Sequence, residues 1–309
     1  MPHSLSTRIA IHGQYLPFLT GAITAAGGTP VGADEQPVGL VLDHGNDKKG
    51  LLGVLDATPS IRWVQLPSAG VEAYAAAMAA HPDKIWTSAK GAYAKPVAEH
   101  ALALTLALLR NLPERAAARS WGAPAGTSLH GLTATIVGAG GVGLEILRLF
   151  EAFDMQVDVV RRRPLPVPGA RHTRTAEHLG ELLPQADVVV IAAALTGDSI
   201  KLIGAKEFRV MKPESILVNV ARGGLVDTSA LAEALAQQRI RGAGLDVTDP
   251  EPLPIGHPLW QEPRALITPH TADTLEMIRP LLADRVGTNV RRFRDGEELE
   301  GLVDPKTGY

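Results

Sequence analysis

The chain has 309 residues, of which 45% are hydrophobic and 20% are charged, an ordinary composition for a soluble globular protein. The formal net charge of -3 gives no reason to expect a nucleic-acid or membrane partner. The absence of cysteine excludes disulfides, thiolate metal sites and a catalytic thiol, and we assign no metal site. The length predicts two domains, each able to bury its own core.

We expect the chain to work in the cytoplasm. Its first residues, 1–17, show no continuous apolar core of the signal-peptide type. The richest apolar run, at residues 101–109, is about half as long as a bilayer span. A reducing compartment also agrees with the lack of cysteine.

Short β-branched runs alternate with Ala- and Leu-rich helical stretches, which predicts parallel sheets with helices on both faces. In the first third we expect strands at residues 8–12, 38–43, 62–66 and 84–88, with a helical pattern at 71–80 among the segments between them. A second series of near-continuous apolar strands is expected at residues 133–138, 156–160, 187–193, 215–220, 242–247 and 265–269. The predicted fold class is therefore α/β, with two doubly wound parallel sheets.

The two series of strands are separated by a long helical pattern at residues 95–120. A last helix, at about residues 274–294, need not belong to the second series. We therefore expect a discontinuous substrate-binding domain, residues 1–95 plus 281–309, and a dinucleotide-binding domain at residues 96–280.

A glycine-rich turn follows the first strand of the second series. Gly138, Gly140 and Gly143 have the G-x-G-x-x-G spacing of a turn that holds a pyrophosphate at a helix N-terminus. Many glycine-rich turns simply turn, but the strand, helix and next strand are all present here, which favours dinucleotide binding. The expected cofactor contacts in this turn are Gly138, Gly140, Gly141, Val142 and Gly143.

The tip of the next strand carries arginines where a dinucleotide-binding protein usually has an acid for the ribose 2′-hydroxyl. Arg161 and Arg162 stand at this place, and Asp158 falls inside the strand. One interpretation is a solvated basic loop. The other is a guanidinium pair for the 2′-phosphate of NADP, which could favour NADPH over NADH by roughly 100-fold, at ~1.5–3 kcal/mol per charge-assisted hydrogen bond. We expect NADP(H) to be preferred, with NAD(H) also usable.

Three polar residues follow later strands. Arg222, Glu251 and His270 each have a structural interpretation, as a surface arginine, a loop acid and an inert loop histidine. All three, however, come after strands, so they should meet at the carboxyl edge of the sheet, where open α/β folds bind ligands. Together they supply a cation for an anionic substrate, a base and a carboxylate that orients it.

Six groups of segments follow one another along the chain: LPSAGVE, VAEHALAL, GAGGVG, MKPESILVNVARGGLVD, GAGLDVTDPEPLP, and HPLW with ITPHTA. In these segments and in their order, the chain resembles the D-isomer-specific 2-hydroxyacid dehydrogenase family over nearly its whole length. The resemblance implies a flavodoxin-like substrate domain, a Rossmann-type coenzyme domain inserted into it, and a homodimer built largely on the coenzyme domain.

The resemblance also implies roles for individual residues. His270 would be the general acid in reduction and the base in the reverse direction, Glu251 would hold its imidazole, and Arg222 would polarise the keto oxygen and help to hold the substrate carboxylate. Asp246 would bind the nicotinamide carboxamide. Backbone N–H groups of Ala69, Gly70 and Val71 would complete the carboxylate site, although a plain glycine turn also explains that stretch. The cofactor cleft would be lined by Ala193, Ala194, Val220 and Ala221.

The chain departs from the family pattern at three positions. Arg161 replaces the acid at the strand tip, and Ala194 replaces a common proline. Asp273 stands where a small residue is common, and it could alter the pKa of His270, contact substrate or cap the last helix. His100, in VAEH, is expected to serve packing or an interface.

The resemblance thus implies an NADPH-preferring oxidoreductase that converts a small 2-keto acid into a D-2-hydroxy acid, with glyoxylate and hydroxypyruvate as the first substrates by analogy. One alternative is a phosphoglycerate dehydrogenase-like enzyme using NAD, ranked lower because the chain ends at Tyr309 without a regulatory domain. The other is a catalytically silent dinucleotide sensor that acts as a co-repressor. The intact Arg222, Glu251 and His270 count against a sensor.

Overall fold

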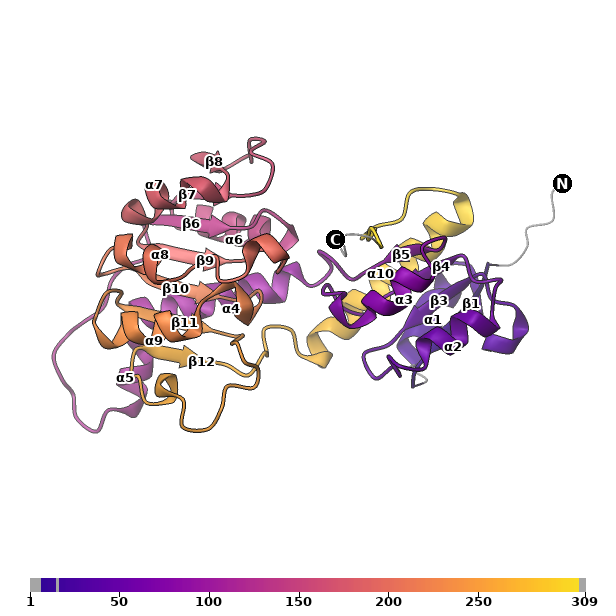
Figure 1. Cartoon of the computed structure of the whole chain (residues 1–309), viewed down its shortest axis with the longest axis horizontal. Helices are drawn as coiled ribbons and strands as arrows, with labels where there is room; N and C mark the ends of the chain where they lie inside the picture. Colours follow the sequence, from indigo (N-terminus) through magenta and orange to yellow (C-terminus); the bar gives the residue numbers. More distant parts are fainter. Residues whose placement is uncertain (1–6, 15–16, 306–309) are drawn as a thin grey trace. The chain divides into compact units, whose positions relative to one another are not determined.

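The computed structural model describes residues 7–14 and 17–305 and divides into two compact units (Figure 1). Unit 1 comprises Met1–Tyr93 and Thr274–Tyr309, and unit 2 comprises Ala94–Asp273. The divisions fall a few residues before those expected at 95/96 and 280/281. They fall there because two long helices, α4 (Ala94–Leu109) and α10 (Leu275–Asp295), each stay whole within one unit.

Unit 1 is built on a five-stranded parallel sheet in the order β2-β1-β3-β4-β5. Its strands are β1 (Thr7–His12), β2 (Gly28–Val31), β3 (Gly39–Leu42), β4 (Trp63–Gln65) and β5 (Ile85–Thr87). Its helices are α1 (Pro17–Ala25), α2 (Leu51–Ala57), α3 (Ala75–Ala80) and α10.

The returning helix α10 is tied to the sheet of unit 1 by a buried amide pair. The Asn289 Nδ2 group donates to Gln65 Oε1 over 2.8 Å, and both side chains are fully buried. Trp63 and Phe293 stack with their ring centroids 5.5 Å apart. The tail therefore belongs to the core of unit 1 and does not continue unit 2.

Unit 2 is built on a seven-stranded parallel sheet in the order β12-β11-β10-β9-β6-β7-β8. Its strands are β6 (Thr133–Val137), β7 (Gln156–Val160), β8 (His172–Arg174), β9 (Val188–Ile191), β10 (Ile216–Asn219), β11 (Gly242–Leu245) and β12 (Ala265–Ile267). The strand order reverses between β6 and β9, which creates the switch point at which open sheets bind ligands. The two parallel α/β units confirm the predicted fold class.

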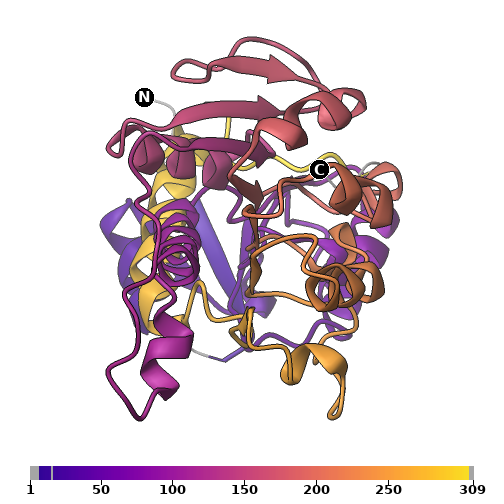
Figure 2. The ribbon, with the colours of Figure 1, turned by 90° about the vertical axis from the view of Figure 1, so that its left-hand side faces the viewer.

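Helices cover both faces of the unit 2 sheet. They are α4, α5 (Leu112–Ala117), α6 (Gly141–Glu151), α7 (Leu179–Leu182), α8 (Ala205–Val210) and α9 (Thr228–Ala236). Helices α4 and α6 pack together on one face, while α8 and α9 pack together on the other, as the magenta and orange helices of Figure 2 show. This double covering explains why the central strands are apolar along their whole length: Val188, Val189, Val190 and Ile191 are all fully buried.

The helix predicted over residues 95–120 is interrupted in the structure. α4 ends at Leu109, Asn111 adopts a left-handed conformation with φ of 52°, and Pro113 is the second residue of the short helix α5. A left-handed residue cannot continue an α-helix, and asparagine is one of the few residues that accept this conformation. Within the described residues, no helix is long and apolar enough to cross a membrane.

Candidate active site

The glycine turn after β6 has the close backbone approaches that its sequence predicts. Gly138 has φ of +116°, and a Cβ there would lie 2.4 Å from the carbonyl oxygen of Ala192. A Cβ on Gly143 would lie 2.0 Å from the carbonyl oxygen of Gly138, so helix α6 can pack this near the strand only with glycine. Gly140, which caps α6, has no atom within 4 Å of its would-be Cβ.

The turn therefore fits a dinucleotide pyrophosphate. The open space at Gly140 adjoins the N-terminus of α6, whose unpaired N–H groups and dipole favour an anion. Gly141 and Val142 contribute the first N–H groups of that helix. Ala193 and Ala194 follow β9 and Val220 and Ala221 follow β10, so they stand at the same edge of the sheet.

The arginine segment begins directly after β7. The backbone N–H of Arg161 donates to the carbonyl of Arg174 over 2.9 Å, which joins the tips of β7 and β8. Arg161 is half-buried and Arg162 is exposed. Both stand at the carboxyl edge of the sheet, on the β7 side of the switch point.

A buried carboxylate holds the base of this segment. Asp158, in the middle of β7, is fully buried, and its Oδ1 accepts from Arg171 Nε over 3.0 Å and lies 2.9 Å from His172 Nδ1. Burial raises the pKa of Asp158, but the hydrogen bonds from Arg171 and His172 outweigh it and lower the pKa below its usual value. The residues between β7 and β8 thus form a loop closed by an ion pair.

On the opposite side of the switch point, His270 and Glu251 form a close pair. The Nδ1 atom of His270 lies 2.7 Å from Glu251 Oε1, and the two side chains are 45% and 43% exposed. With Nδ1 engaged by the carboxylate, Nε2 is the ring nitrogen left to meet a substrate. The two residues therefore have the relative geometry of a general acid or base and its orienting carboxylate.

The backbone of His270 is held in an uncommon conformation. Its φ is 53°, in the left-handed region, and its N–H lies 2.8 Å from the Asp246 carbonyl and 3.0 Å from the Thr268 carbonyl. A non-glycine residue keeps such a conformation only where its surroundings fix it. The segment 268–272 is fixed in this way by Asp246.

The side chain of Asp246 is 1% exposed and makes four hydrogen bonds or close polar contacts. Its Oδ1 accepts from Thr268 Oγ1 over 2.6 Å and from the N–H of Thr271 over 2.9 Å, and its Oδ2 accepts from the N–H of Ala272 over 3.1 Å. Burial alone would raise the pKa of Asp246, but the hydrogen bonds outweigh burial and lower the pKa to about 2. The observed role of this carboxylate is to hold the backbone on both sides of His270.

The fourth contact comes from His100, a residue that the sequence analysis assigned to packing or an interface. Its Nε2 lies 2.9 Å from Thr268 Oγ1 and 3.3 Å from Asp246 Oδ1. His100 stands on helix α4, 168 positions before Thr268, so no local pattern could connect them. The only hint in the sequence is a histidine within an otherwise apolar helical face.

Arg222 and Asp273 are two further charged residues of unit 2 at this edge. Arg222 follows β10, and its carbonyl accepts from Asn219 Nδ2 over 3.0 Å, which orders the turn. Burial raises the pKa of Asp273 above its usual value; the charge of Asp246 raises it further, and the charges of His270 and Arg222 offset only part of this. His270 and Arg222 thus both lie within electrostatic range of Asp273.

The remaining predicted substrate contacts belong to unit 1. Ala69, Gly70 and Val71 follow β4, and Ser68 Oγ donates to the carbonyl of Gly70 over 2.6 Å, which ties the turn together. Within the described residues there is no cluster of three or more metal-ligating side chains.

The chain is similar to known proteins along most of its length. A model of the D-isomer-specific 2-hydroxyacid dehydrogenase NAD-binding domain matches residues 102–272, a segment that lies within unit 2. A glyoxylate reductase of Thermofilum pendens is 31% identical over 265 residues, which cover 81% of this chain and 77% of that protein. A glyoxylate/hydroxypyruvate reductase B of Pectobacterium carotovorum is 35% identical over 219 residues, covering 68% of each.

A similar fold is found among crystal structures. A D-isomer-specific 2-hydroxyacid dehydrogenase of Xanthobacter autotrophicus, in complex with NADPH and MES, has a TM-score of 0.83 and 25% sequence identity. The similarity covers 98% of this chain and 100% of that chain.

Proposed function

Because the chain belongs to the D-isomer-specific 2-hydroxyacid dehydrogenase family, we propose that it is an NADPH-preferring reductase of small 2-keto acids. Family membership supports NAD(P)-dependent hydride transfer between nicotinamide and 2-keto or 2-hydroxy acids. The observation that carries the proposal is the His270–Glu251 pair, 2.7 Å apart, at the same sheet edge as the glycine turn and Arg222.

In the proposed reaction His270 moves the proton. Nicotinamide dinucleotide bound at the glycine turn would supply the hydride. His270, through Nε2, protonates the carbonyl oxygen of the substrate as the alcohol forms and takes the proton back in the reverse direction. Glu251 keeps the imidazole oriented through Nδ1.

Arg222 meets the anionic part of the substrate. A guanidinium offers a positive charge and several N–H donors in a planar fork, so Arg222 can polarise the keto oxygen and hold the carboxylate. We assign the backbone N–H groups of Ala69, Gly70 and Val71 to the same carboxylate. Asp246 already accepts hydrogen bonds from Thr268, Thr271 and Ala272. Its proposed contact with the nicotinamide carboxamide therefore uses a carboxylate lone pair that these hydrogen bonds leave available.

The choice of dinucleotide is assigned to Arg161 and Arg162. Both stand at the tip of β7, where a carboxylate would repel a 2′-phosphate and a guanidinium binds it. The similar Xanthobacter protein was crystallised with NADPH, which supports the same choice. The adenine side of the cleft is assigned to Ala193 and Ala194, and the nicotinamide side to Val220 and Ala221.

We also propose that the protein is a homodimer assembled on unit 2. Its segment after α4 carries two large apolar side chains in solvent, Leu112 at 53% and Trp121 at 94% exposure. Light scattering coupled to gel filtration would give twice the monomer mass, and a monomer mass would remove the assembly from the proposal.

The test of the function is an initial-rate assay of NADPH and NADH oxidation with glyoxylate, hydroxypyruvate, pyruvate and branched 2-keto acids, with His270→Ala as the control. Turnover of at least one acid, faster with NADPH, supports the reductase. NAD-dependent oxidation of 3-phosphoglycerate without 2-keto acid reduction would identify the phosphoglycerate alternative. Tight dinucleotide binding without turnover of any acid would indicate a sensor.

A further inference from the structure

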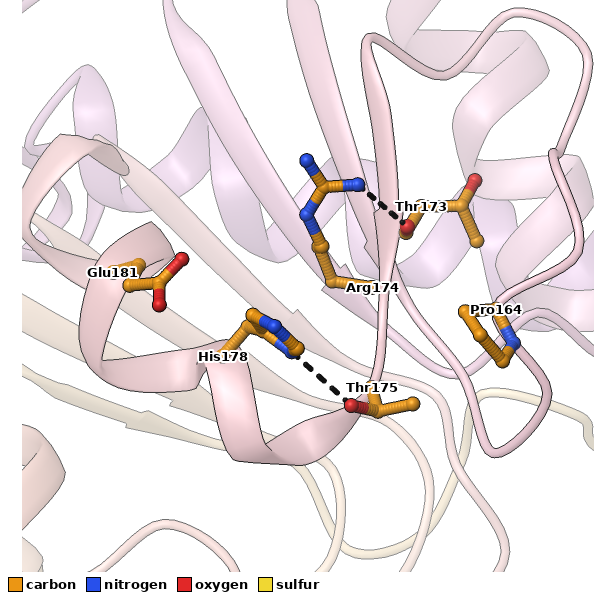
Figure 3. Close-up of a pocket in the computed structure, with 6 residues that line it drawn as sticks. All are labelled: Pro164, Thr173, Arg174, Thr175, His178 and Glu181. Atoms are coloured by element: carbon orange, nitrogen blue, oxygen red, sulfur yellow. Dashed lines mark hydrogen bonds between the residues drawn. The ribbon is translucent and has the colours of Figure 1, made fainter.

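An open hollow lies beside the arginine segment, at the carboxyl end of β8. It has a volume of about 470 Å³, and Figure 3 shows Arg174 and His178 between Glu181 on one side and Pro164 on the other. Its lining residues are Pro164, Thr173, Arg174, Thr175, His178 and Glu181. None of them has a part in the function proposed above.

The hollow adjoins the proposed 2′-phosphate contacts. The N–H of Arg161 donates to the carbonyl of Arg174 over 2.9 Å, so the two arginines start from hydrogen-bonded backbones of adjacent strand tips. Pro164, which lines the hollow, comes two positions after Arg162. Arg161, Arg162 and Arg174 are therefore carried by one rim of the sheet.

This rim is strongly basic. Residues 161–178 contain five arginines and two histidines but one acid, Glu177. Of the five, Arg171 is neutralised by the buried Asp158. Within the described part of the chain Arg174 has no carboxylate partner, and its Nη1 donates a long bond of 3.2 Å to the Thr173 carbonyl. Its guanidinium can thus turn to an anion without breaking an ion pair.

We propose that Arg174, supported by His178, completes the subsite for the 2′-phosphate of NADP as a third cation, on the strand tip beside that of Arg161 and Arg162. The inference rests on the proposed dinucleotide function and adds residues to it. His178 is oriented for this by Thr175, whose Oγ1 lies 3.1 Å from His178 Nδ1, leaving Nε2 to the hollow. Glu181 on the far side repels an anion there, so the phosphate sits on the Arg174 side.

A third arginine changes the expected behaviour of the subsite. A phosphate has three terminal oxygens, and guanidinium groups from two strand tips can hold it from two directions, whereas Arg161 and Arg162 approach from one. Preference for NADPH should then be reduced, but not abolished, by substituting the arginines of one strand tip alone, either Arg161 and Arg162 at β7 or Arg174 at β8. It should be lost only when both tips are changed.

The test is calorimetric binding of adenosine 2′,5′-bisphosphate, with 5′-AMP as the probe that lacks the 2′-phosphate. Arg174→Ala should weaken bisphosphate binding about tenfold or more and leave 5′-AMP binding within about twofold. Arg174→Lys, which keeps the charge but not the fork, should restore part of the loss. Arg209→Ala, an exposed arginine on α8, is the matched control and should change neither ligand.

His178→Gln, which keeps a polar side chain of similar size, should weaken the bisphosphate less than Arg174→Ala does. Unchanged bisphosphate binding by Arg174→Ala, with a loss in Arg161→Ala/Arg162→Ala, overturns this inference and leaves the proposed function standing. Failure of the unmodified protein to bind either nucleotide overturns the dinucleotide site itself. A loss of both ligands in Arg174→Ala with an unchanged melting temperature would place Arg174 outside the 2′-phosphate subsite and contradict the proposal.

Discussion

The switch point divides the seven-stranded sheet into two wings, β6-β7-β8 on one side and β9-β10-β11-β12 on the other. Each wing has one buried aspartate, and the two aspartates have different hydrogen-bond partners. On the β7 side, Asp158 is held by the side chains of Arg171 and His172, which come from the edge strand β8 or directly before it. On the β11 side, Asp246 is held chiefly by the N–H groups of Thr271 and Ala272 and by the hydroxyl of Thr268. One carboxylate joins side chains, and the other fixes a backbone.

The difference matches the groups that each wing positions in the proposed function. A general acid must lie within a few tenths of an ångström of its target, and a carboxylate bound to the neighbouring backbone sets that position directly. A phosphate contact made by long arginine side chains tolerates more variation. It is enough that the loop which carries Arg161 and Arg162 stays attached to the sheet, and the Asp158 ion pair achieves this.

The largest effect that would sharpen this comparison is expected from His270→Ala. Loss of the proposed general acid should lower kcat by about 10²–10⁴-fold, while NADPH binding stays unchanged because the proposed cofactor contacts do not include the His270 side chain. The side chain is 45% exposed, so the fold should survive. Steady-state rates and fluorescence titration with NADPH measure the two quantities. A small decrease in kcat would remove His270 from the proposed proton transfer.

Asp246→Asn should reduce both stability and rate. The amide would place an NH₂ group against the N–H of Thr271 or of Ala272, each of which now donates to a carboxylate oxygen. We expect the free energy of unfolding to fall by about 2–3 kcal/mol and kcat to fall with it. Urea denaturation and initial rates provide the measurements. Unchanged stability would mean that Asp246 does not anchor the loop.

The same carboxylate predicts an acid limit of stability. The pKa of Asp246 falls from 3.8 to about 2 on folding, so its contribution is complete above pH 3.8 and is lost as the pH falls from there to about 2. The contribution at neutral pH is roughly 2 kcal/mol. Denaturation measured across this window should show a slope that Asp246→Asn removes. A slope retained in the variant would assign it to other carboxyl groups.

His100→Ala tests whether helix α4 takes part in the same network. Removing the contact of Nε2 with Thr268 Oγ1 should lower kcat by about 3- to 10-fold and leave the KM for NADPH unchanged. His100→Gln, which restores a donor, should recover part of the rate. Equal effects of the two substitutions would indicate packing alone.

Asp158→Asn should have the smallest effect and mark the contrast with Asp246→Asn. Arg171 and His172 are 29% and 47% exposed, so water can partly replace the lost carboxylate. We expect a loss of about 1–2 kcal/mol of stability and no change in kcat at saturating NADPH. A decrease in kcat as large as that of Asp246→Asn would erase the distinction between the wings.

Most of the fold follows from the sequence, and the exceptions have clear causes. The strands of unit 2 can be predicted because they are apolar along their length, and they are apolar because helices cover both faces of the sheet. β2 and β8 were missed: GTPV contains glycine and proline, and HTR is polar because it forms an exposed edge. Neither segment has the alternation or apolar run that indicates a strand.

For the candidate site, the sequence indicates which residues follow strands but not what holds them. His270 and Glu251 were placed at one sheet edge by their positions, and the structure brings them within 2.7 Å. The hydrogen bonds of Asp246 to the segment after Thr268 could not be predicted. Their donors are backbone N–H groups, which every residue except proline carries, so no residue type marks them in the sequence. The contact of His100 with Thr268 could not be predicted for another reason: the two residues are 168 positions apart in the sequence.

The most direct test of the division between the wings is the ratio of kcat/KM for NADPH to that for NADH in Arg161→Ala/Arg162→Ala. The account predicts that kcat/KM with NADPH falls by about tenfold, through KM, while kcat and the NADH reaction change little, and that the remaining preference comes from Arg174. It would be contradicted by an unchanged ratio, or by an equal loss with both cofactors. Either result would mean that the arginines at the tip of β7 do not select the dinucleotide.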